Sequence, residues 1–592
     1  MASSGGKSAL LRRATLPRHR VFYSSSPSRS LRDIVSSSNS DVHNAYDDKP
    51  EKLGGPMISA ISRGDRRTPD ERGSLNDGFP SDVDEKKLLR KIDFYLIPWL
   101  SVLYLLSFLD RSAIGNARLY GLEKELNLTS QQYNIVLTVF FLPYGLFEVP
   151  SNVLLKRLRP SIWFPTITIL VGICILSQGL VKNYHGLLVA RFFLGVTEAG
   201  LFPGANYLLS GWYKRNEFGL RASVFFSAAT ISGAFGGLLS FAINKMDGIG
   251  NYSGWRWIFI IIGLATFISG VLSFWLCVDF PDTASFLSDS ERRAVIYRLQ
   301  QDQQFSAAGE GFKWANVWKT FLQWQTWCGM GAYIGCVAPL YAFSLFTPTI
   351  VKSLNPSYTS NVANLISVPV YVVACLFTVV VGFLADRTAR RSLYSIGLSL
   401  LGVIGYIVLI ANNPAGKPGV SYFGVYLAAL GIYPMIPNTI AIVAGNSEGA
   451  YVRSVVTGVV ISFGNLNGAV SSNIYPSRTS PRFFLGHSVV LAYIVIGIIC
   501  NAIFFFGLQW ENRKREAGLR DETILANDPA MLASGKDLQA EAERIRAEEI
   551  KQGGAIGGLF RRLHVGGCGM YATVEEAKAL KGDQYSGFRY RS

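Results

Sequence analysis

The stretch FYLIPWLSVLYLLSFLDR, residues 94–111, is an apolar run that closes on two charged side chains, Asp110 and Arg111. A helix needs about 20 apolar residues to cross a bilayer, and this run approaches that length. Arg191 and Glu198 interrupt a second apolar run in the same way. A charge in the hydrocarbon layer costs at least about 2.5 kcal/mol on insertion scales, so such residues indicate a function. We expect this chain to move a charged solute through a membrane.

Composition supports a membrane protein. Of the 592 residues, 49% are hydrophobic and 17% are charged, and the mean hydropathy is +0.25. The fold class we predict is an all-α polytopic membrane protein with about twelve transmembrane helices. A polar segment, 279–319, divides the apolar runs into two sets of about six, which predicts two pseudo-symmetric six-helix bundles. The runs begin near Phe94, Tyr133, Ile162, Leu187, Leu220, Trp257, Thr326, Asn361, Leu393, Tyr422, Val455 and Ser488.

Five segments follow from this division. In the central linker, Ser288 and Glu291 have capping-box spacing, and the residues after them predict a short amphipathic helix. The last segment contains one expected helix over 537–552. The segments are a disordered cytoplasmic tail (1–90), a first six-helix bundle (91–280), a cytoplasmic linker (281–322), a second six-helix bundle (323–510) and a cytoplasmic tail (511–592).

Lysine and arginine are distributed unevenly between the links on the two sides of the membrane. The side whose links carry more of them is expected to be cytoplasmic. This rule places both termini in the cytoplasm. Two glycosylation sequons, at Asn127 and Asn251, then fall on external links. The net charge of +16 is assigned to tails and links that face anionic lipid, not to nucleic acid. The protein is expected in the plasma membrane. The alternative is a mitochondrial membrane, because the first 32 residues are rich in Arg and Ser and contain no acidic residue.

No sequence motif indicates catalysis. The HExxH, GxSxG and GxxxxGK patterns are absent, and no pair of cysteines has the spacing of metal ligands. We therefore expect a protein that is not an enzyme, that holds no metal or cofactor, and that draws its energy from a proton gradient. The expected partners are a small organic anion, protons and the lipid bilayer, and the expected state is a monomer.

An internal repeat links the two halves. NVLLKR at 152–157 aligns with GFLADR at 382–387, each after the second helix of its half. The longer stretch GFLADRTARR resembles the loop signature of the major facilitator superfamily. Acidic groups are favoured at helix N-termini and basic groups at C-termini. From this and the family pattern we expect a conformational latch made by Gly382, Asp386, Arg387, Arg390 and Arg391.

A narrower resemblance spans residues 91–510. LDRSAIGNARL from Leu109, EVPSNVLLKRLRPSIW from Glu148, RFFLGVTEAGLFPGANYLLSGWY from Arg191, DFPDTASFLSDSER from Asp279 and FGNLNGAVSSNIYPSRTSPRFFLGH from Phe463 resemble the fungal allantoate and nicotinate permeases. The resemblance implies an anion:cation symporter that takes up a small carboxylate, such as nicotinate, pantothenate or allantoate, with protons by alternating access. Ala113 stands where such permeases usually carry Asn, and Asn152 and Lys156 replace the Gly and Asp of the loop signature.

The charged residues suit this chemistry. Arg191 and Glu198 are seven residues apart and so share one helix face. Because Arg keeps its charge and offers a bidentate fork to carboxylates, Arg111 is our first candidate for the substrate anchor and Arg191 the second. Asp110 and Glu198 are the candidates for proton coupling, a role that the resemblance also implies. The alternative is that these groups form structural ion bridges that lock two helices together.

The second half carries almost no charge inside its apolar runs, so we expect it to supply shape and hydrogen bonds. Tyr341, Asn438 and Asn465 are its candidate substrate-binding residues, although packing is an ordinary role for such side chains. Two other functions remain open. A drug:proton antiporter shares this architecture, but the segment 233–237 reads GAFGG, with Ala in place of the Pro of the exporter motif. A nutrient sensor that does not transport would share the same residues.

Overall fold

The computed structural model describes residues 80 and 82–301, residues 318–519 except 319, 389, 415, 448, 449, 477 and 478, and short pieces of the C-terminal tail at 522–527, 537–552, 570–574, 577 and 581. Most of the disordered tail expected over residues 1–90, with its Arg- and Ser-rich start, lies outside the described residues, as do residues 302–317. The last residues of the expected tail are helical, because α2 begins at Glu85.

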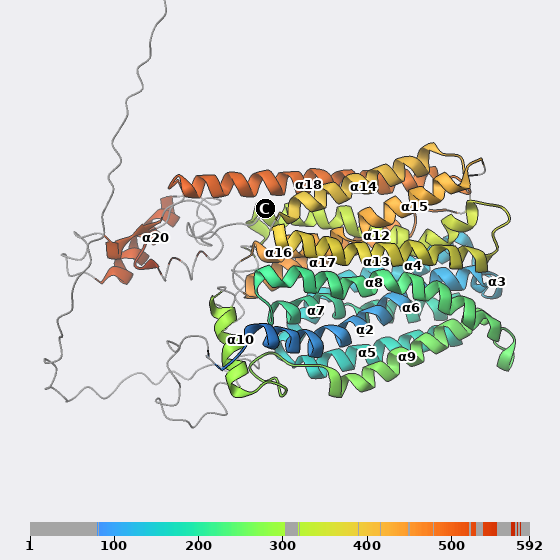
Figure 1. The fold of residues 1–592 in the computed structure, drawn as a ribbon, viewed down its shortest axis with the longest axis horizontal. Helices are drawn as coiled ribbons and strands as arrows, with labels where there is room; N and C mark the ends of the chain where they lie inside the picture. The colour runs from blue at the N-terminus through green and yellow to red at the C-terminus, as the bar shows by residue number, and fades with distance from the viewer. Residues whose placement is uncertain are drawn as a thin grey trace, which may run out of the picture. The chain divides into compact units, whose positions relative to one another are not determined.

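The first half is a series of helices joined by short links (Figure 1). The helix α2 begins after Asp84, whose side chain accepts from the backbone N–H groups of Lys86 and Lys87. Thr129 and Gln132 form a capping box at the start of α4. The elements are α2 (Glu85–Leu119), α3 (Leu122–Glu125), α4 (Ser130–Arg157), α5 (Pro160–Leu180), α6 (Tyr184–Glu198), α7 (Leu201–Ser210), α8 (Arg215–Ile243), the 3-10 turns η2 (Asn244–Met246) and η3 (Ile249–Asn251), and α9 (Gly254–Leu276).

The linker helix α10 (Asp289–Gln301) has the predicted capping box, because Ser288 and Glu291 exchange side-chain to backbone hydrogen bonds. The second half repeats the pattern of the first. Its helices are α12 (Trp324–Ser353), α13 (Ser360–Thr388), α14 (Arg391–Ala411), α15 (Pro418–Ile432), α16 (Met435–Gly445), α17 (Ala450–Ser471) and α18 (Phe484–Glu516). In the tail, α20 (Leu538–Gln552) accompanies η5 (Leu525–Asn527) and two short parallel strands, β1 (Thr523–Ile524) and β2 (Met570–Tyr571).

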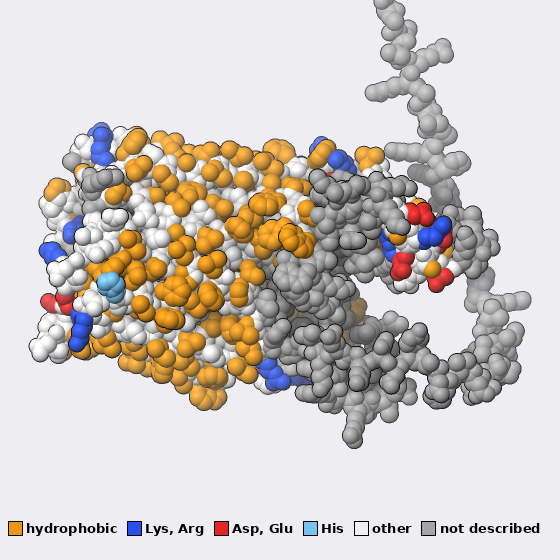
Figure 2. All heavy atoms as spheres, turned by 180° about the vertical axis from the view of Figure 1, so that it is seen from behind, with side chains coloured by type: hydrophobic (Ala, Val, Ile, Leu, Met, Phe, Trp, Pro, Cys, Tyr) orange, Lys and Arg blue, Asp and Glu red, His pale blue; other side chains and the backbone are white. Residues whose placement is uncertain are grey.

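Within the described residues, eleven helical segments are long and apolar enough to cross a membrane, and α17 adds a shorter apolar stretch, Val455–Ser471. The prediction of about twelve transmembrane helices is therefore confirmed. Figure 2 shows hydrophobic side chains covering the helical body on one face, with charged side chains near its ends. This pattern fits a protein whose apolar surface is solvated by lipid.

The first helix extends further than its apolar run. The run stops at Leu109, but α2 continues for ten residues, to Leu119, so Asp110 and Arg111 lie inside the helix. Residues 112–117, most of them small or polar, are buried inside the protein. A Cβ added at Gly115, for example, would lie 2.9 Å from the backbone oxygen of Leu345 on α12. Helices in a membrane tolerate such residues where other helices, not lipid, surround them.

The fourth and tenth apolar runs are each broken in two. One break falls directly after Glu198, between α6 and α7, and the other falls at Tyr433 and Pro434, between α15 and α16. Broken helices are tolerated at membrane depth only where they are buried within protein or line a cavity. Because the breaks occur at equivalent places in the two halves, they support the predicted repeat.

The two halves meet along two principal pairs of helices, α4 with α17 and α8 with α13. Both copies of the repeated signature lie at these contacts. Gly382 on α13 faces Ser223 on α8, and a Cβ added there would collide with the Ser223 side chain. On the other pair, a Cβ added at Gly458 of α17 would lie 3.3 Å from Nδ2 of Asn152 on α4. Each signature copy therefore marks a close approach to the opposite half.

The two ends of the bundle are named here by α10, which lies at one end, and by α3, which lies at the other (Figure 1). At the α3 end, the Tyr120 hydroxyl after α2 donates to Asn361 Oδ1 at 2.9 Å and accepts from Asn364 Nδ2 at 3.2 Å. Both asparagines belong to α13. Hydrogen bonds therefore join the two halves at the α3 end.

Candidate functional site

Arg111 lies at the centre of the candidate site, with 3% of its surface exposed. Its Nη2 is 2.6 Å from Oε1 of Glu198 at the end of α6, and Ser107, one turn earlier on α2, also donates to that oxygen. The guanidinium carbon is 4.8 Å from the centroid of the Tyr144 ring and 4.9 Å from that of Phe108. Ring faces attract a guanidinium at such distances. The structure therefore holds the predicted anchor and the predicted coupling acid as a buried, hydrogen-bonded ion pair.

A chain of hydrogen bonds continues from this pair into the second half. Arg111 Nη1 donates to the Tyr341 hydroxyl at 3.0 Å, and that hydroxyl donates to Oδ1 of Asn465 at 2.6 Å. Asn465 Nδ2 then donates to Oε2 of Glu148 at 2.9 Å. The chain joins α2, α6 and α4 of the first half to α12 and α17 of the second. Two of the three expected contributors from the second half therefore reach the charged centre.

Glu148 was missed by the sequence reasoning. It is fully buried on α4, and no hydrogen-bond partner for its Oε1 lies in the described part of the chain. A signal was available, because Glu148 interrupts an apolar run just as Glu198 does. Placing a carboxylate inside a membrane helix costs free energy, so a buried Glu at this position indicates a function.

Asp110 lies beside Arg111 in sequence but points elsewhere, because adjacent residues of a helix are separated by about 100°. Its Oδ2 accepts from Thr266 Oγ1 of α9 at 3.4 Å, and Oδ1 has no partner among the described residues. Arg191 is 2% exposed on the same buried face of α6 as Glu198. Its Nε and Nη2 have no hydrogen-bond partner in the described structure. Arg191 therefore keeps donors that an anion could use.

The remaining predicted residues lie apart from this centre. Asn438 is buried in α16, where its amide donates to the Pro434 carbonyl of its own chain segment at 3.3 Å, so no described contact joins it to Arg111. At the α10 end, Asp386 Oδ2 accepts from the Leu220 N–H of α8 at 2.6 Å, and Asp386 pairs with Arg391. This contact ties α13 to the start of α8.

The other two basic residues of the expected latch, Arg387 and Arg390, are exposed. Within the described part of the chain, no group of three or more His, Cys, Asp or Glu side chains is arranged to hold a metal ion.

Comparisons with known proteins identify the family of the chain. The family described as the Major Facilitator Superfamily matches residues 100–472. The chain is 36% identical over 448 residues to the MFS-type transporter cnsO of Penicillium expansum, a match that covers 74% of this chain and 86% of that protein. It is 33% identical over 445 residues to the high-affinity nicotinic acid transporter of Saccharomyces cerevisiae, covering 75% of this chain and 82% of that protein.

Among solved structures, the proton:xylose symporter XylE aligns with a TM-score of 0.55 at 14% identity, covering 70% of this chain and 96% of the symporter. At this identity the likeness shows the fold alone. The chain is a polytopic transporter by class, and it belongs to the major facilitator superfamily.

Proposed function

We propose that this protein is a secondary active transporter that takes up a small organic carboxylate together with protons by alternating access. The single observation that carries this proposal is the buried Arg111–Glu198 pair, at 2.6 Å, within a hydrogen-bond chain that crosses from one half to the other. Such a pair places a cation for the substrate beside a carboxylate that can take up a proton. The proton gradient supplies the energy, and no cofactor takes part.

The charged partner of Arg111 in the described structure is Glu198, and a substrate carboxylate must replace it. When a substrate carboxylate binds the guanidinium, Glu198 loses its counter-ion while it remains buried. A buried carboxylate without a cation is costly, so Glu198 is expected to take up a proton at that point. Arg191 adds unpaired donors on the same face of α6, and Asp110 is a second carboxylate within the first half. Substrate binding and proton binding are thereby coupled through Arg111.

The surroundings of Arg111 favour a flat, aromatic acid. The rings of Phe108, Phe140, Tyr144 and Tyr341 all lie with centroids within 5.4 Å of the guanidinium carbon. Ring faces offer stacking surface to a planar substrate, and the hydroxyls of Tyr341 and Tyr144 offer hydrogen bonds. The relative that is named as a nicotinic acid transporter supports nicotinate as the first substrate to test. Pantothenate and allantoate are further candidates of the same class.

We place the α10 end in the cytoplasm and the protein in the plasma membrane as a monomer. The positive-inside rule supports this orientation, because the basic links follow the helix ends near α10. The exposed sequon residues are Asn127, in the link after α3, and Asn251, the last residue of η3. Both lie at the end that this orientation places outside. The opposite orientation would expose the basic links to the exterior.

The test is transport of radiolabelled nicotinate in proteoliposomes with a pH gradient. We expect wild-type protein to accumulate nicotinate against its concentration gradient. Asp110→Asn and Glu198→Gln should each abolish accumulation. Glu198→Gln should still exchange labelled for unlabelled nicotinate, because exchange needs no net proton movement. Asp289→Asn, which removes a 92% exposed carboxylate from α10, is the matched control.

Three outcomes would count against the proposal. Accumulation that survives both substitutions would rule out coupling through these residues. Protein that binds nicotinate but gives no counterflow would be a sensor and not a transporter. Expulsion of lipophilic cations in exchange for protons, with no nicotinate uptake, would identify an antiporter.

A further inference from the structure

The contact between α4 and α17 buries Glu148 between the two halves. Glu148 has no exposed surface, and its Oε2 accepts from Asn465 Nδ2 at 2.9 Å. One turn earlier on α4, a Cβ added at Gly145 would lie 2.7 Å from the Leu466 side chain and 3.2 Å from the Ser462 carbonyl oxygen of α17. The two helices therefore touch beside this carboxyl, which is removed from solvent as long as the contact is closed.

The buried charges around the candidate site do not balance. Two of these side chains are cations and three are carboxyls, namely Arg111, Arg191, Asp110, Glu148 and Glu198. If every carboxyl were ionised, the group would carry one negative charge in excess. A buried charge without a counter-ion is costly, and the group that bears it is neutralised instead. Without a substrate, one of the three carboxyls therefore holds a proton.

Glu148 is the carboxyl with the least contact to a cation. Glu198 lies 2.6 Å from Arg111, and Asp110 interacts with both Arg191 and Arg111. Among the described cations, Glu148 interacts with Arg111 alone, and that guanidinium already pairs with Glu198. The hydrogen bond that Glu148 accepts comes from a neutral amide. The proton therefore belongs on Glu148.

The other groups around Glu148 do not change this charge count. The titratable side chains that face it are Arg111 of α2, Tyr144 of its own helix, and Tyr333 and Tyr341 of α12. Tyrosine is neutral near pH 7. Helix α17 presents Asn465 and Ser462. Oε1 of Glu148 and Oγ of Ser462 both lack a hydrogen-bond partner in the described structure, and a protonated carboxyl can donate from Oε1.

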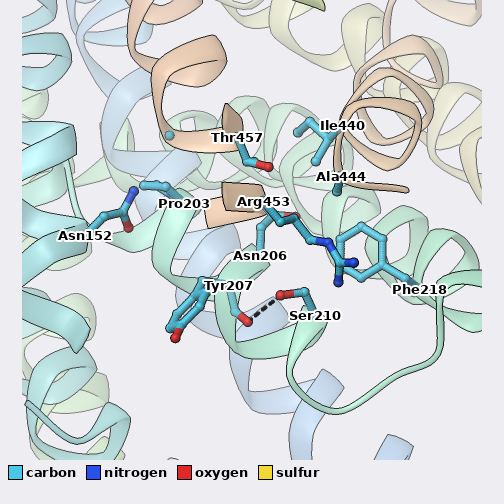
Figure 3. Close-up of a pocket in the computed structure, with 11 residues that line it drawn as sticks. Asn152, Pro203, Asn206, Tyr207, Ser210, Phe218, Ile440, Ala444, Arg453 and Thr457 are labelled. Atoms are coloured by element: carbon cyan, nitrogen blue, oxygen red, sulfur yellow. Dashed lines mark hydrogen bonds between the residues drawn. The ribbon is translucent and has the colours of Figure 1, made fainter. Parts of the chain in front are cut away.

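A small cavity lies beside the same contact (Figure 3). Asn152 follows Glu148 by four residues, so both side chains lie on one face of α4. Asn152 lines the cavity together with Thr457 and Gly458 of α17. The cavity volume is about 20 Å³, which is room for one water molecule. Separation of α4 from α17 would enlarge this cavity and let water reach Glu148.

We propose that Glu148 binds a proton each time the α4–α17 contact closes and releases it to water each time the contact opens. The proposal rests on the proposed function for the transport cycle. The empty protein and the loaded protein both carry this proton, because the charge count requires it in either case. A substrate carboxylate adds one further negative charge, which the proton on Glu198 balances. Glu148 therefore sets how the transition rate depends on pH, and the number of protons moved with each substrate does not depend on it.

Infrared spectroscopy of the full chain in nanodiscs tests the protonation itself. Wild type at pH 7 without substrate should show the C=O band of a protonated carboxyl, and Glu148→Gln should lack it. Asp289→Asn, which removes a 92% exposed carboxyl, is the control and should keep the band. Absence of the band in wild type would overturn the proposal. So would a band that disappears in Asp110→Asn and persists in Glu148→Gln.

Exchange of labelled for unlabelled nicotinate in proteoliposomes tests the effect on the transition. In Glu198→Gln the substrate carboxylate replaces the charge of Glu198, so Glu148 must still be protonated before the loaded protein closes. Above the ordinary pKa of a glutamate, about 4.3, the protonated fraction of a hydrated carboxyl falls about tenfold per pH unit. Exchange by Glu198→Gln at saturating nicotinate should therefore fall at least about tenfold from pH 6 to pH 8, with equal pH on both sides.

Two double variants separate the proton from the contact. Glu148→Gln/Glu198→Gln should change its exchange rate less than about twofold over the same pH range. Asn465→Ala/Glu198→Gln removes the hydrogen bond between the halves but keeps the carboxyl, so it should exchange more slowly and retain the pH dependence. Equal pH dependence in Glu198→Gln and Glu148→Gln/Glu198→Gln would overturn the proposal.

Failure of the proposed function would look different. Wild-type proteoliposomes would then accumulate no nicotinate at any pH, whereas the infrared band does not depend on transport. If the function holds, Glu148→Gln should accumulate nicotinate with the same ratio of protons to nicotinate as wild type. A lower ratio in Glu148→Gln would overturn the proposal, because it would make Glu148 a coupling group.

Discussion

Tyr341 shows how one side chain couples the two halves. Its hydroxyl accepts from Arg111 of α2 and donates to Asn465 of α17, so it is the middle member of the chain of hydrogen bonds. Nothing in its local sequence distinguishes it from the other tyrosines of the second half. Its importance comes from a contact between positions 230 residues apart.

Tyr341→Phe should therefore weaken transport without unfolding the protein. The substitution keeps the ring beside Arg111 and removes two hydrogen bonds, each worth about 0.5 to 1.5 kcal/mol. We expect the KM for nicotinate to rise by about tenfold and the thermal stability in detergent to change little. Tyr394→Phe, on α14 and outside the site, is the control. An unchanged KM in Tyr341→Phe would show that the hydroxyl makes no contribution to the substrate site.

Glycines decide how closely the helices of this bundle approach each other. In α6, a Cβ added at Gly195 would collide with the backbone oxygen of Phe140 on α4. A backbone oxygen cannot rotate away, so the helices would have to separate. Glu198 lies one turn further along α6, so this contact also positions the acid that binds Arg111.

Gly195→Ala should accordingly reduce both stability and substrate affinity. Overpacking in a tight core costs about 1 to 3 kcal/mol. The matched control is Gly397→Ala on α14, where an added Cβ would meet nothing within 4 Å. Thermal unfolding followed by size-exclusion fluorescence should show a lower midpoint for Gly195→Ala and an unchanged or higher midpoint for Gly397→Ala. Equal midpoints would contradict the assignment of a tight α4–α6 contact.

The linker helix α10 is held to α2 by an ion pair, in which Lys91 Nζ lies 2.8 Å from Oε2 of Glu291. Partial burial raises the pKa of Glu291, but the hydrogen bond from Lys91, the hydrogen bonds from Ser288 and the charge of Lys91 outweigh it and hold the pKa below its usual value. The Lys91–Glu291 pair therefore stabilises the contact between α10 and α2 fully above the ordinary pKa of a glutamate. This stabilisation is lost as the pH falls through the lowered pKa of Glu291.

Hydrogen exchange can follow this dependence. The protection factors of α10 amides should be constant from pH 8 to about pH 5 and should fall at more acidic pH. Glu291→Gln should show weaker protection at neutral pH and less change on acidification. Helix α9, which lies within the membrane-spanning part, serves as the internal reference. A pH response that is identical in Glu291→Gln and wild type would assign the effect to other groups.

At the scale of the whole molecule, the two ends of the bundle are joined by different contacts. Tyr120 bonds Asn361 and Asn364 at the α3 end, whereas Asp386 bonds the start of α8 at the α10 end. Alternating access requires each set of contacts to break in turn.

Tyr120→Phe should favour opening at the α3 end. The change removes two hydrogen bonds between the halves, and a loss of about 1 kcal/mol shifts a two-state equilibrium by about fivefold. Pulsed electron paramagnetic resonance between labels at the exposed residues Lys124 and Lys352 should show a larger population of long distances. Tyr252→Phe, in the link before α9, should leave the distances unchanged. The same distances in Tyr120→Phe as in wild type would show that other contacts close this end.

The sequence alone determined the class of protein, the number of spans and the identity of four buried charges. These follow from local physics, because lipid accepts long apolar helices and penalises every charge within them. Only the tertiary structure decided which charges meet. It pairs Arg111 with Glu198 and turns Asp110 toward Thr266. It also adds Glu148 to the hydrogen-bond network and leaves Asn438 outside it. Those choices depend on how helices far apart in the chain pack together, and no periodicity within a single helix encodes its neighbours.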